Sequence, residues 1–76
     1  MHEKVVAILE TVVPGCTTKG SSNLVDDGVV DSFAIASTVA LIEKEFEIEV
    51  DADYIIPENF ETVDTVVAFV KEIMAA

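Results

Sequence analysis

Apolar residues recur in the first part of the chain at the spacing of one helical face. The positions i, i+3, i+4 and i+7 are occupied by Val5, Ile8, Leu9 and Val12. In an α-helix these positions share one side. The pair Pro14-Gly15 follows directly, and such a pair interrupts helical structure. The pattern therefore predicts an amphipathic helix that ends before Pro14.

A second apolar stripe begins near Ser32. Its main positions are Ile35, Val39, Ile42 and Phe46. We expect Phe33, Ala36 and Ala40 to widen this stripe toward the core. Charged residues enter the segment only at Glu43, so the spacing predicts a second helix whose first turns carry no charge.

A third stripe lies near the end of the chain. It consists of Val63, Val66, Val67, Val70, Ile73 and Met74. Valine lowers helix propensity by a few tenths of a kcal/mol, roughly, at each position. The 3.6-residue period outweighs this cost, because in a strand the same residues would point to both faces. We therefore predict a third helix that begins near Glu61 or Thr62.

The connecting segments are predicted to be irregular but partly buried. Between Pro14 and Asp31 runs a long polar stretch, and we expect its later apolar residues to hold it against the core. These are Leu24, Val25, Val29 and Val30. The residues from Phe46 to Val50 alternate like a strand but have no partner strand, so we interpret Ile48 and Val50 as apolar plugs beneath the helices. Residues 52–56 are expected to form one short helical turn before Pro57.

These elements together predict an all-α fold in a single domain spanning residues 1–76. We expect a small four-helix bundle with three longer helices, one short helix and a long loop between the first two helices.

The net charge of the chain is strongly negative. Fifteen acidic residues face four basic ones, for a formal net charge of −11. Such a surface repels phosphate backbones, which argues against nucleic-acid binding, and it favours partners with basic surfaces. Acidic residues and threonines interrupt the apolar runs well short of a membrane-spanning length, and no secretory signal pattern is present. We expect a monomeric cytoplasmic protein without membrane insertion, and a fold that loosens at low salt.

Few residues could support catalysis or bind a metal. Cys16 is the only cysteine and His2 the only histidine, and His2 lies where a helix end frays. A cysteine nucleophile needs an activating base, so we interpret Cys16 as an ordinary loop or half-buried cysteine. The acid pairs Asp26/Asp27 and Asp51/Asp53 do not match a calcium-binding loop, and no metal site is predicted.

The tripeptide Asp31-Ser32-Phe33 stands where the long loop meets the uncharged helix. Either polar residue can act as a helix cap. In this position and order, together with the segment from Leu41 to Val50 and the later Asn59-Phe60-x-Thr62-Val63, the chain resembles the acyl carrier protein superfamily. The resemblance extends over nearly the whole chain. The superfamily includes the peptidyl and D-alanyl carrier proteins.

The resemblance implies a carrier that is not itself an enzyme. Ser32 would bear 4′-phosphopantetheine, transferred from coenzyme A by a phosphopantetheinyl transferase that recognises Asp31. The thiol of that arm would hold acyl or aminoacyl groups as thioesters. An activating ligase would load them, and a downstream acyltransferase or synthase would take them. By the same reasoning Phe33, Ile35, Ala36 and Val39 are candidates for the cargo or partner face.

The start of the second helix departs from the pattern of fatty-acid carriers. Those carriers usually place acids soon after the serine, whereas here the positions are Ala34, Ser37 and Thr38. This difference favours apolar docking around Phe33, Ile35 and Ala36, and a stand-alone aminoacyl, D-alanyl or specialised-pathway carrier.

Two other functions remain open at the level of sequence. An unmodified acidic adaptor could dock a basic protein partner through the same helix face. A small enzyme is disfavoured, because no acid–base or nucleophile–base pair can be assembled.

Overall fold

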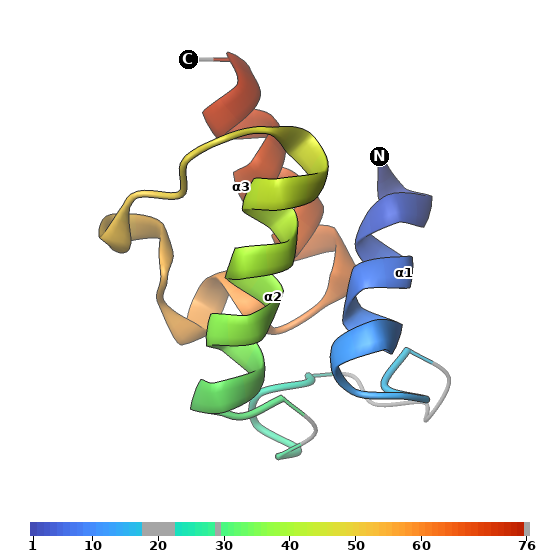
Figure 1. Cartoon of the computed structure of the whole chain (residues 1–76). Helices are drawn as coiled ribbons and strands as arrows, with labels where there is room; N and C mark the ends of the chain where they lie inside the picture. The colour runs from blue at the N-terminus through green and yellow to red at the C-terminus, as the bar shows by residue number, and fades with distance from the viewer. Residues whose placement is uncertain (18–22, 29, 76) are drawn as a thin grey trace.

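Three α-helices form the body of the protein in a computed structural model, which describes residues 1–17, 23–28 and 30–75 (Figure 1). They are α1 (His2–Val12), α2 (Ser32–Phe46) and α3 (Val63–Ala75). Two short 3₁₀ turns, η1 (Ala52–Tyr54) and η2 (Pro57–Phe60), lie between α2 and α3. The described residues contain no β-strand. The all-helical prediction is confirmed.

The fourth, short helix of the predicted bundle takes a different form. Residues 52–54 make a single 3₁₀ turn in the predicted place, and a second turn follows at Pro57. Pro57 stands at the beginning of η2, where its missing N–H costs nothing. The described part of the chain thus holds three α-helices and two 3₁₀ turns, and the predicted four-helix bundle is not confirmed.

Helix α1 runs antiparallel to α2 and contacts both other helices (Figure 1). Its buried residues are Val5, Ile8 and Leu9, and Val12 packs against them. These are the four residues of the predicted stripe. At the end of α1, the Glu10 carboxylate accepts the backbone N–H groups of Gly15 and Thr17, at 2.7 and 2.8 Å, and the Thr17 hydroxyl as well. The side chain of Glu10, within α1, thus stabilises the turn at Pro14.

Helix α2 buries its predicted main stripe but not the residues expected to widen it. Val39 and Ile42 are buried, and Ile35 and Phe46 pack against the core. Its buried residues are Ala34, Thr38, Val39 and Ile42. Ala36 and Ala40 are exposed, and Phe33 is 81% exposed. At 100° per residue, positions 34, 38 and 42 lie on one side and positions 33, 36 and 40 on the other. The prediction that Phe33, Ala36 and Ala40 widen the core stripe is therefore wrong.

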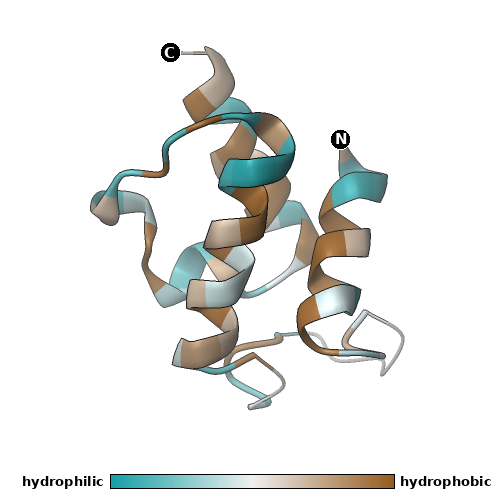
Figure 2. Cartoon of the chain, viewed as in Figure 1, coloured by the Kyte–Doolittle hydropathy of each residue, from teal (hydrophilic) through white to brown (hydrophobic). Residues whose placement is uncertain are grey.

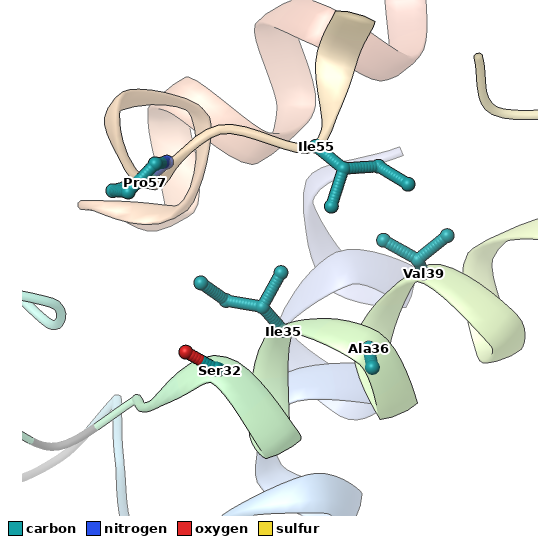
Figure 3. A pocket seen from close by; sticks show the side chains of 6 residues that line it. All are labelled: Ser32, Ile35, Ala36, Val39, Ile55 and Pro57. Atoms are coloured by element: carbon teal, nitrogen blue, oxygen red, sulfur yellow. The ribbon is translucent and has the colours of Figure 1, made fainter. Parts of the chain in front are cut away.

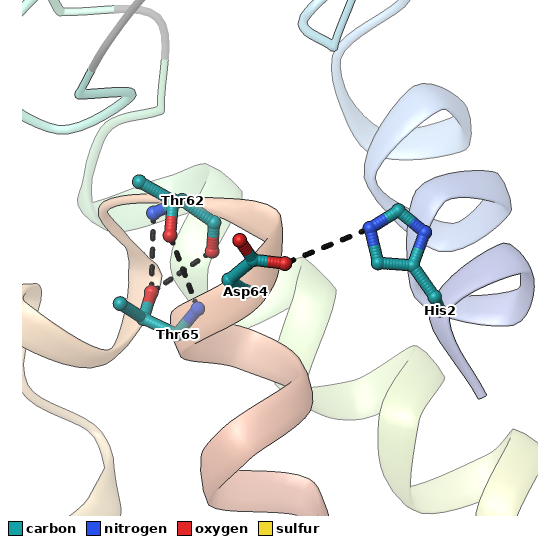
Figure 4. A network of polar contacts seen from close by, with 4 residues as sticks. All are labelled: His2, Thr62, Asp64 and Thr65. Carbon is teal, nitrogen blue, oxygen red and sulfur yellow. Dashed lines mark hydrogen bonds and ion pairs between the residues drawn. The ribbon is translucent and has the colours of Figure 1, made fainter.

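Helix α3 begins with a reciprocal pair of threonines (Figure 4). Thr62 Oγ1 accepts the N–H of Thr65, and Thr65 Oγ1 accepts the N–H of Thr62, both at 3.1 Å. This arrangement is a capping box with threonine in the place usually taken by Glu, and it confirms Thr62 as the residue that starts the helix. The buried residues are Val66, Phe69 and Val70. Met74 is 50% exposed, so its predicted place in the stripe is wrong.

Aromatic rings fill the space between α3 and the 3₁₀ turns. The ring of Phe69 lies 5.2 Å from that of Phe60 and 6.2 Å from that of Tyr54, measured between centroids. Val50 is buried and Ile48 is half-buried against the core. Glu43 Oε2 accepts the N–H of Val50 at 2.9 Å, which fixes this loop beneath α2. The prediction that Ile48 and Val50 act as apolar plugs is confirmed.

The segment that leads into α2 is anchored to the core. Leu24 and Val30 are buried and Val25 packs against the core. The N–H of Leu24 donates to the carbonyl of Glu61 at 2.7 Å, and the N–H of Val30 donates to the carbonyl of Leu24 at 2.9 Å. The predicted anchoring is confirmed for these three residues, whereas Val29 lies outside the described residues.

Within the described residues, no helix is both long and apolar enough to cross a membrane.

Candidate functional site

Ser32 is the first residue of α2 and is exposed. The chain just before it is held in place, because Val30 is only 1% exposed and hydrogen-bonded to Leu24. Gly28 adopts a φ of +72° within the turn that precedes them, a backbone conformation that favours glycine. Val30, buried and hydrogen-bonded to Leu24, therefore anchors the chain two residues before the exposed Ser32 side chain.

Asp31 caps the helix. Its backbone is extended, and its Oδ1 accepts the N–H of Ala34 at 2.9 Å. This is the standard N-cap bond to the third helical residue. Because Asp31 fills the cap, the Ser32 hydroxyl is not needed for it. The first N–H groups of α2 remain directed outward with the partial positive charge of a helix N-terminus.

A groove lies beside Ser32, between α2 and the 3₁₀ turns (Figure 3). It has a volume of about 400 Å³. Its lining residues are Ser32, Ile35, Ala36, Val39, Ile55 and Pro57. Apart from the Ser32 hydroxyl, every lining side chain is apolar. We call this feature the Ser32 groove.

The structure brings three of the four predicted face residues to this groove. Ile35, Ala36 and Val39 line it, and Ile35 and Val39 point across it toward Ile55 and Pro57 (Figure 3). Phe33 lies apart from them and lines a second groove of about 430 Å³. The other residues of that groove are Thr11, Val12, Ser37, Ala40 and Leu41.

The second wall of the Ser32 groove was not predicted from the sequence. Ile55 and Pro57 follow η1 and come from a segment that shows no clear apolar period. Ile55 is 40% exposed and Ile56 39% exposed. Two adjacent isoleucines before a proline, outside any amphipathic pattern, are the only signal that could have indicated a surface role.

The charge around Ser32 is unevenly distributed. The exposed side chains of the first half of α2 are Ser32, Phe33, Ala36 and Ala40, and none is charged. Hydropathy along α2 turns strongly polar only near its C-terminal end (Figure 2). Two of the neutral positions noted in the sequence, Ala34 and Thr38, are buried. Their neutrality reflects packing, and the exposed residues are what make this surface uncharged.

The other candidate residues are far from such a site or enclosed. His2 opens α1, at the end of the molecule opposite to the start of α2 (Figure 1). Its Nε2 lies 3.8 Å from Oδ1 of Asp64 in α3, and both side chains are largely exposed (Figure 4). Cys16 is 1% exposed. In the described residues, no three His, Cys, Asp or Glu side chains are grouped so as to hold a metal ion.

Comparisons with protein-family models, with curated proteins and with solved structures found no match.

Proposed function

We propose that the protein is a carrier that bears a 4′-phosphopantetheine arm on Ser32 and delivers acyl or aminoacyl groups to separate enzymes. The observation that supports this most directly is the setting of the Ser32 hydroxyl. It is exposed at the start of α2 and lies at the edge of an apolar groove. Asp31 caps the helix, so the Ser32 hydroxyl is not needed for capping. The ordered sequence resemblance points to the same serine.

The residues present fit such an arm. A phosphodiester on Ser32 would lie at the N-terminus of α2, where outward N–H groups and the helix dipole favour negative charge. The apolar part of the arm or its cargo could rest along Ile35, Ala36 and Val39, with Ile55 and Pro57 opposite. When bound, the arm would supply a thiol that holds the cargo as a thioester.

The attachment step needs no catalytic group on this chain. The Ser32 oxygen would form a bond to the phosphorus that carries the pantetheine unit of coenzyme A. The pyrophosphate bond of coenzyme A would break, and 3′,5′-adenosine diphosphate would leave. The serine proton would pass to a base on the transferase, which explains how a chain with one remote histidine can take part.

The partners of such a carrier are a phosphopantetheinyl transferase, an activating ligase and a downstream acyltransferase or synthase. The protein itself would not be an enzyme. We place it in the cytoplasm as a monomer, where these partners would meet it in turn. The neutral surface of α2 favours aminoacyl, D-alanyl or specialised-pathway cargo over standard fatty-acid synthesis.

An unmodified adaptor is the second candidate function. The observation that favours it is the exposure of three large apolar side chains, Phe33, Ile55 and Ile56, which are 81%, 40% and 39% exposed. A protein partner could cover these side chains directly, without any group attached to Ser32.

Mass spectrometry distinguishes the two functions. The purified protein is incubated with coenzyme A, magnesium and a promiscuous phosphopantetheinyl transferase. We expect the mass to rise by one phosphopantetheine group, and fragmentation to place that group on Ser32. Ser32→Ala should abolish the increment, whereas Ser37→Ala, a matched change on the same helix, should retain it.

A folded sample that gains no mass, while a carrier of proven competence is modified in the same reaction, would contradict the carrier function and favour the adaptor. Modification of Ser37 instead of Ser32 would contradict the site. Loading of the modified protein by fatty-acyl, aminoacyl and D-alanyl ligases would then identify the cargo class.

A further inference from the structure

The two sides of the Ser32 groove differ in charge. On α2, Ala36 lines the groove, Phe33 is exposed outside it, and no charge is present before Glu43. On the opposite side, the exposed residues of the 3₁₀ turns mix acids with apolar groups. We call this set the η1–η2 rim; it consists of Asp51, Ala52, Asp53, Ile55, Ile56, Pro57 and Glu58.

Two acids of this rim are available to a partner. The Asp51 carboxylate caps η1 by accepting the N–H of Asp53 at 2.9 Å, so it serves the local structure. Asp53 and Glu58 stand in the first turns of η1 and η2 and are exposed. Asp53 lies two residues before Ile55, and Glu58 directly follows Pro57. They therefore border the two residues that form the far wall of the groove.

From this asymmetry we infer that the transferase that modifies Ser32 docks across the groove in two unlike halves. An apolar patch of the transferase covers Phe33 and Ala36, and basic residues of the transferase face Asp53 and Glu58. This inference rests on the proposed carrier function and adds the surface that recognises its first partner.

Distance excludes the acids at the other end of α2 from this role. Glu45 lies thirteen residues after Ser32, and the helical rise places it roughly 20 Å away along the axis. At physiological ionic strength the Debye length is only about 8 Å, so Glu45 contributes little to a contact centred on Ser32. The rim acids are exposed and close in sequence to Ile55 and Pro57, which line the groove. Complementary charge there would set the rate of encounter and the orientation of docking.

The charged half is tested by paired neutralisation. Rates of modification by transferase, coenzyme A and magnesium are compared for Asp53→Asn/Glu58→Gln and for Glu45→Gln/Glu72→Gln, each of which removes two exposed negative charges. At low salt we expect the KM for the rim variant to rise about threefold to tenfold, the range for loss of two exposed charge pairs. The control should change less than about twofold, and high salt should remove the difference.

If the rim variant and the control variant raise the KM equally, net charge alone matters and the inference is overturned. An unchanged KM for the rim variant would overturn it as well. If wild-type protein is not modified at all, the carrier function itself fails, so the two failures are distinguishable.

The apolar half is tested by truncating Phe33. Phe33→Ala should raise the KM at low and high salt alike, because the lost contact is apolar. Met74→Ala removes another exposed apolar side chain, on α3, and should leave the KM unchanged. An unchanged KM for Phe33→Ala, or a loss that disappears at high salt, would contradict the apolar contact.

Discussion

Two neighbouring residues at the start of α2, Asp31 and Ser32, have different roles in the structure. Asp31 accepts the N–H of Ala34 and so ends the extended segment and begins the helix. Ser32 is left with an exposed hydroxyl beside an apolar groove. The sequence resemblance assigns Asp31 a second role, in recognition by the transferase. A carboxylate and an amide can both accept the capping bond, which allows the two roles to be separated.

Substitutions of Asp31 separate capping from recognition. Asp31→Ala should lower the free energy of unfolding by about 1 kcal/mol, because the cap is lost. Asp31→Asn should keep nearly all of that stability, since asparagine caps helices about as well as aspartate. Both variants should be modified more slowly at Ser32, because each lacks the charge. Thermal unfolding followed by circular dichroism and time-resolved mass spectrometry measure the two effects. Wild-type modification rates for Asp31→Asn would limit Asp31 to capping.

At the scale of elements, α2 has two unlike ends. Its first half carries no charge and borders two apolar grooves, and its last turns hold Glu43, Lys44 and Glu45. Glu47 ends the helix in the left-handed region, with a φ of 54° and a ψ of 47°, while Glu43 holds the loop that follows through the N–H of Val50. A non-glycine residue in the left-handed region is strained. The backbone conformation of Glu47 therefore lowers the stability of the fold at the turn beneath α2.

Replacement of Glu47 by glycine should relieve this cost. We expect Glu47→Gly to raise the free energy of unfolding by about 0.5–1 kcal/mol, because glycine adopts positive φ without a Cβ clash. This corresponds to an increase of a few degrees, roughly, in the melting temperature of a domain of this size. Glu72→Gly removes the same charge inside α3 and should lower stability by about 1 kcal/mol. A decrease for both variants would contradict the assignment of strain to Glu47.

At the scale of the whole molecule, repulsion among acidic side chains opposes folding. The net charge is −11, within dimensions of 32 × 22 × 19 Å. The Lys4–Glu45 ion pair is 3.7 Å long, His2 Nε2 lies 3.8 Å from Asp64 Oδ1, and both contacts are exposed. Exposed contacts of this kind contribute little to the free energy of unfolding. Screening by dissolved ions is therefore the main factor that weakens repulsion among the acidic side chains.

Added salt should therefore stabilise the fold. We expect the melting temperature to rise steadily as sodium chloride increases from about 10 mM, where the Debye length is about 30 Å, to about 0.1 M, where it is about 10 Å. The variant Glu45→Gln/Glu72→Gln should show a smaller rise, since it carries two fewer negative charges. Differential scanning calorimetry measures both. A melting temperature that stays constant or falls with salt would show that the acids are spaced widely enough not to repel.

The sequence by itself determined where most of the elements lie. The apolar stripe from Val5 to Val12, the break at Pro14 and the cap at Asp31 are local features, and each reappears in the structure. The plugs Ile48 and Val50 could also be predicted, because an alternating segment without a partner strand can bury its apolar residues only in a loop. The local sequence around Ser32 indicates only a helix start, and its choice as the candidate attachment site rested on the resemblance over nearly the whole chain.

Tertiary packing was needed to show which residues widen the buried face of α2 and which segment lies opposite Ser32. The first half of α2 is uncharged on every side, so hydropathy could not choose between Phe33 and Ala34, or between Ala36 and Thr38. The packing of α1 against α2 made that choice and left Phe33 outside. In the same way, Ile55 and Pro57 become the second wall of the groove only because the 3₁₀ turns fold back toward α2. Periodicity reports the local geometry of one helix, whereas a groove depends on two segments that meet across the chain.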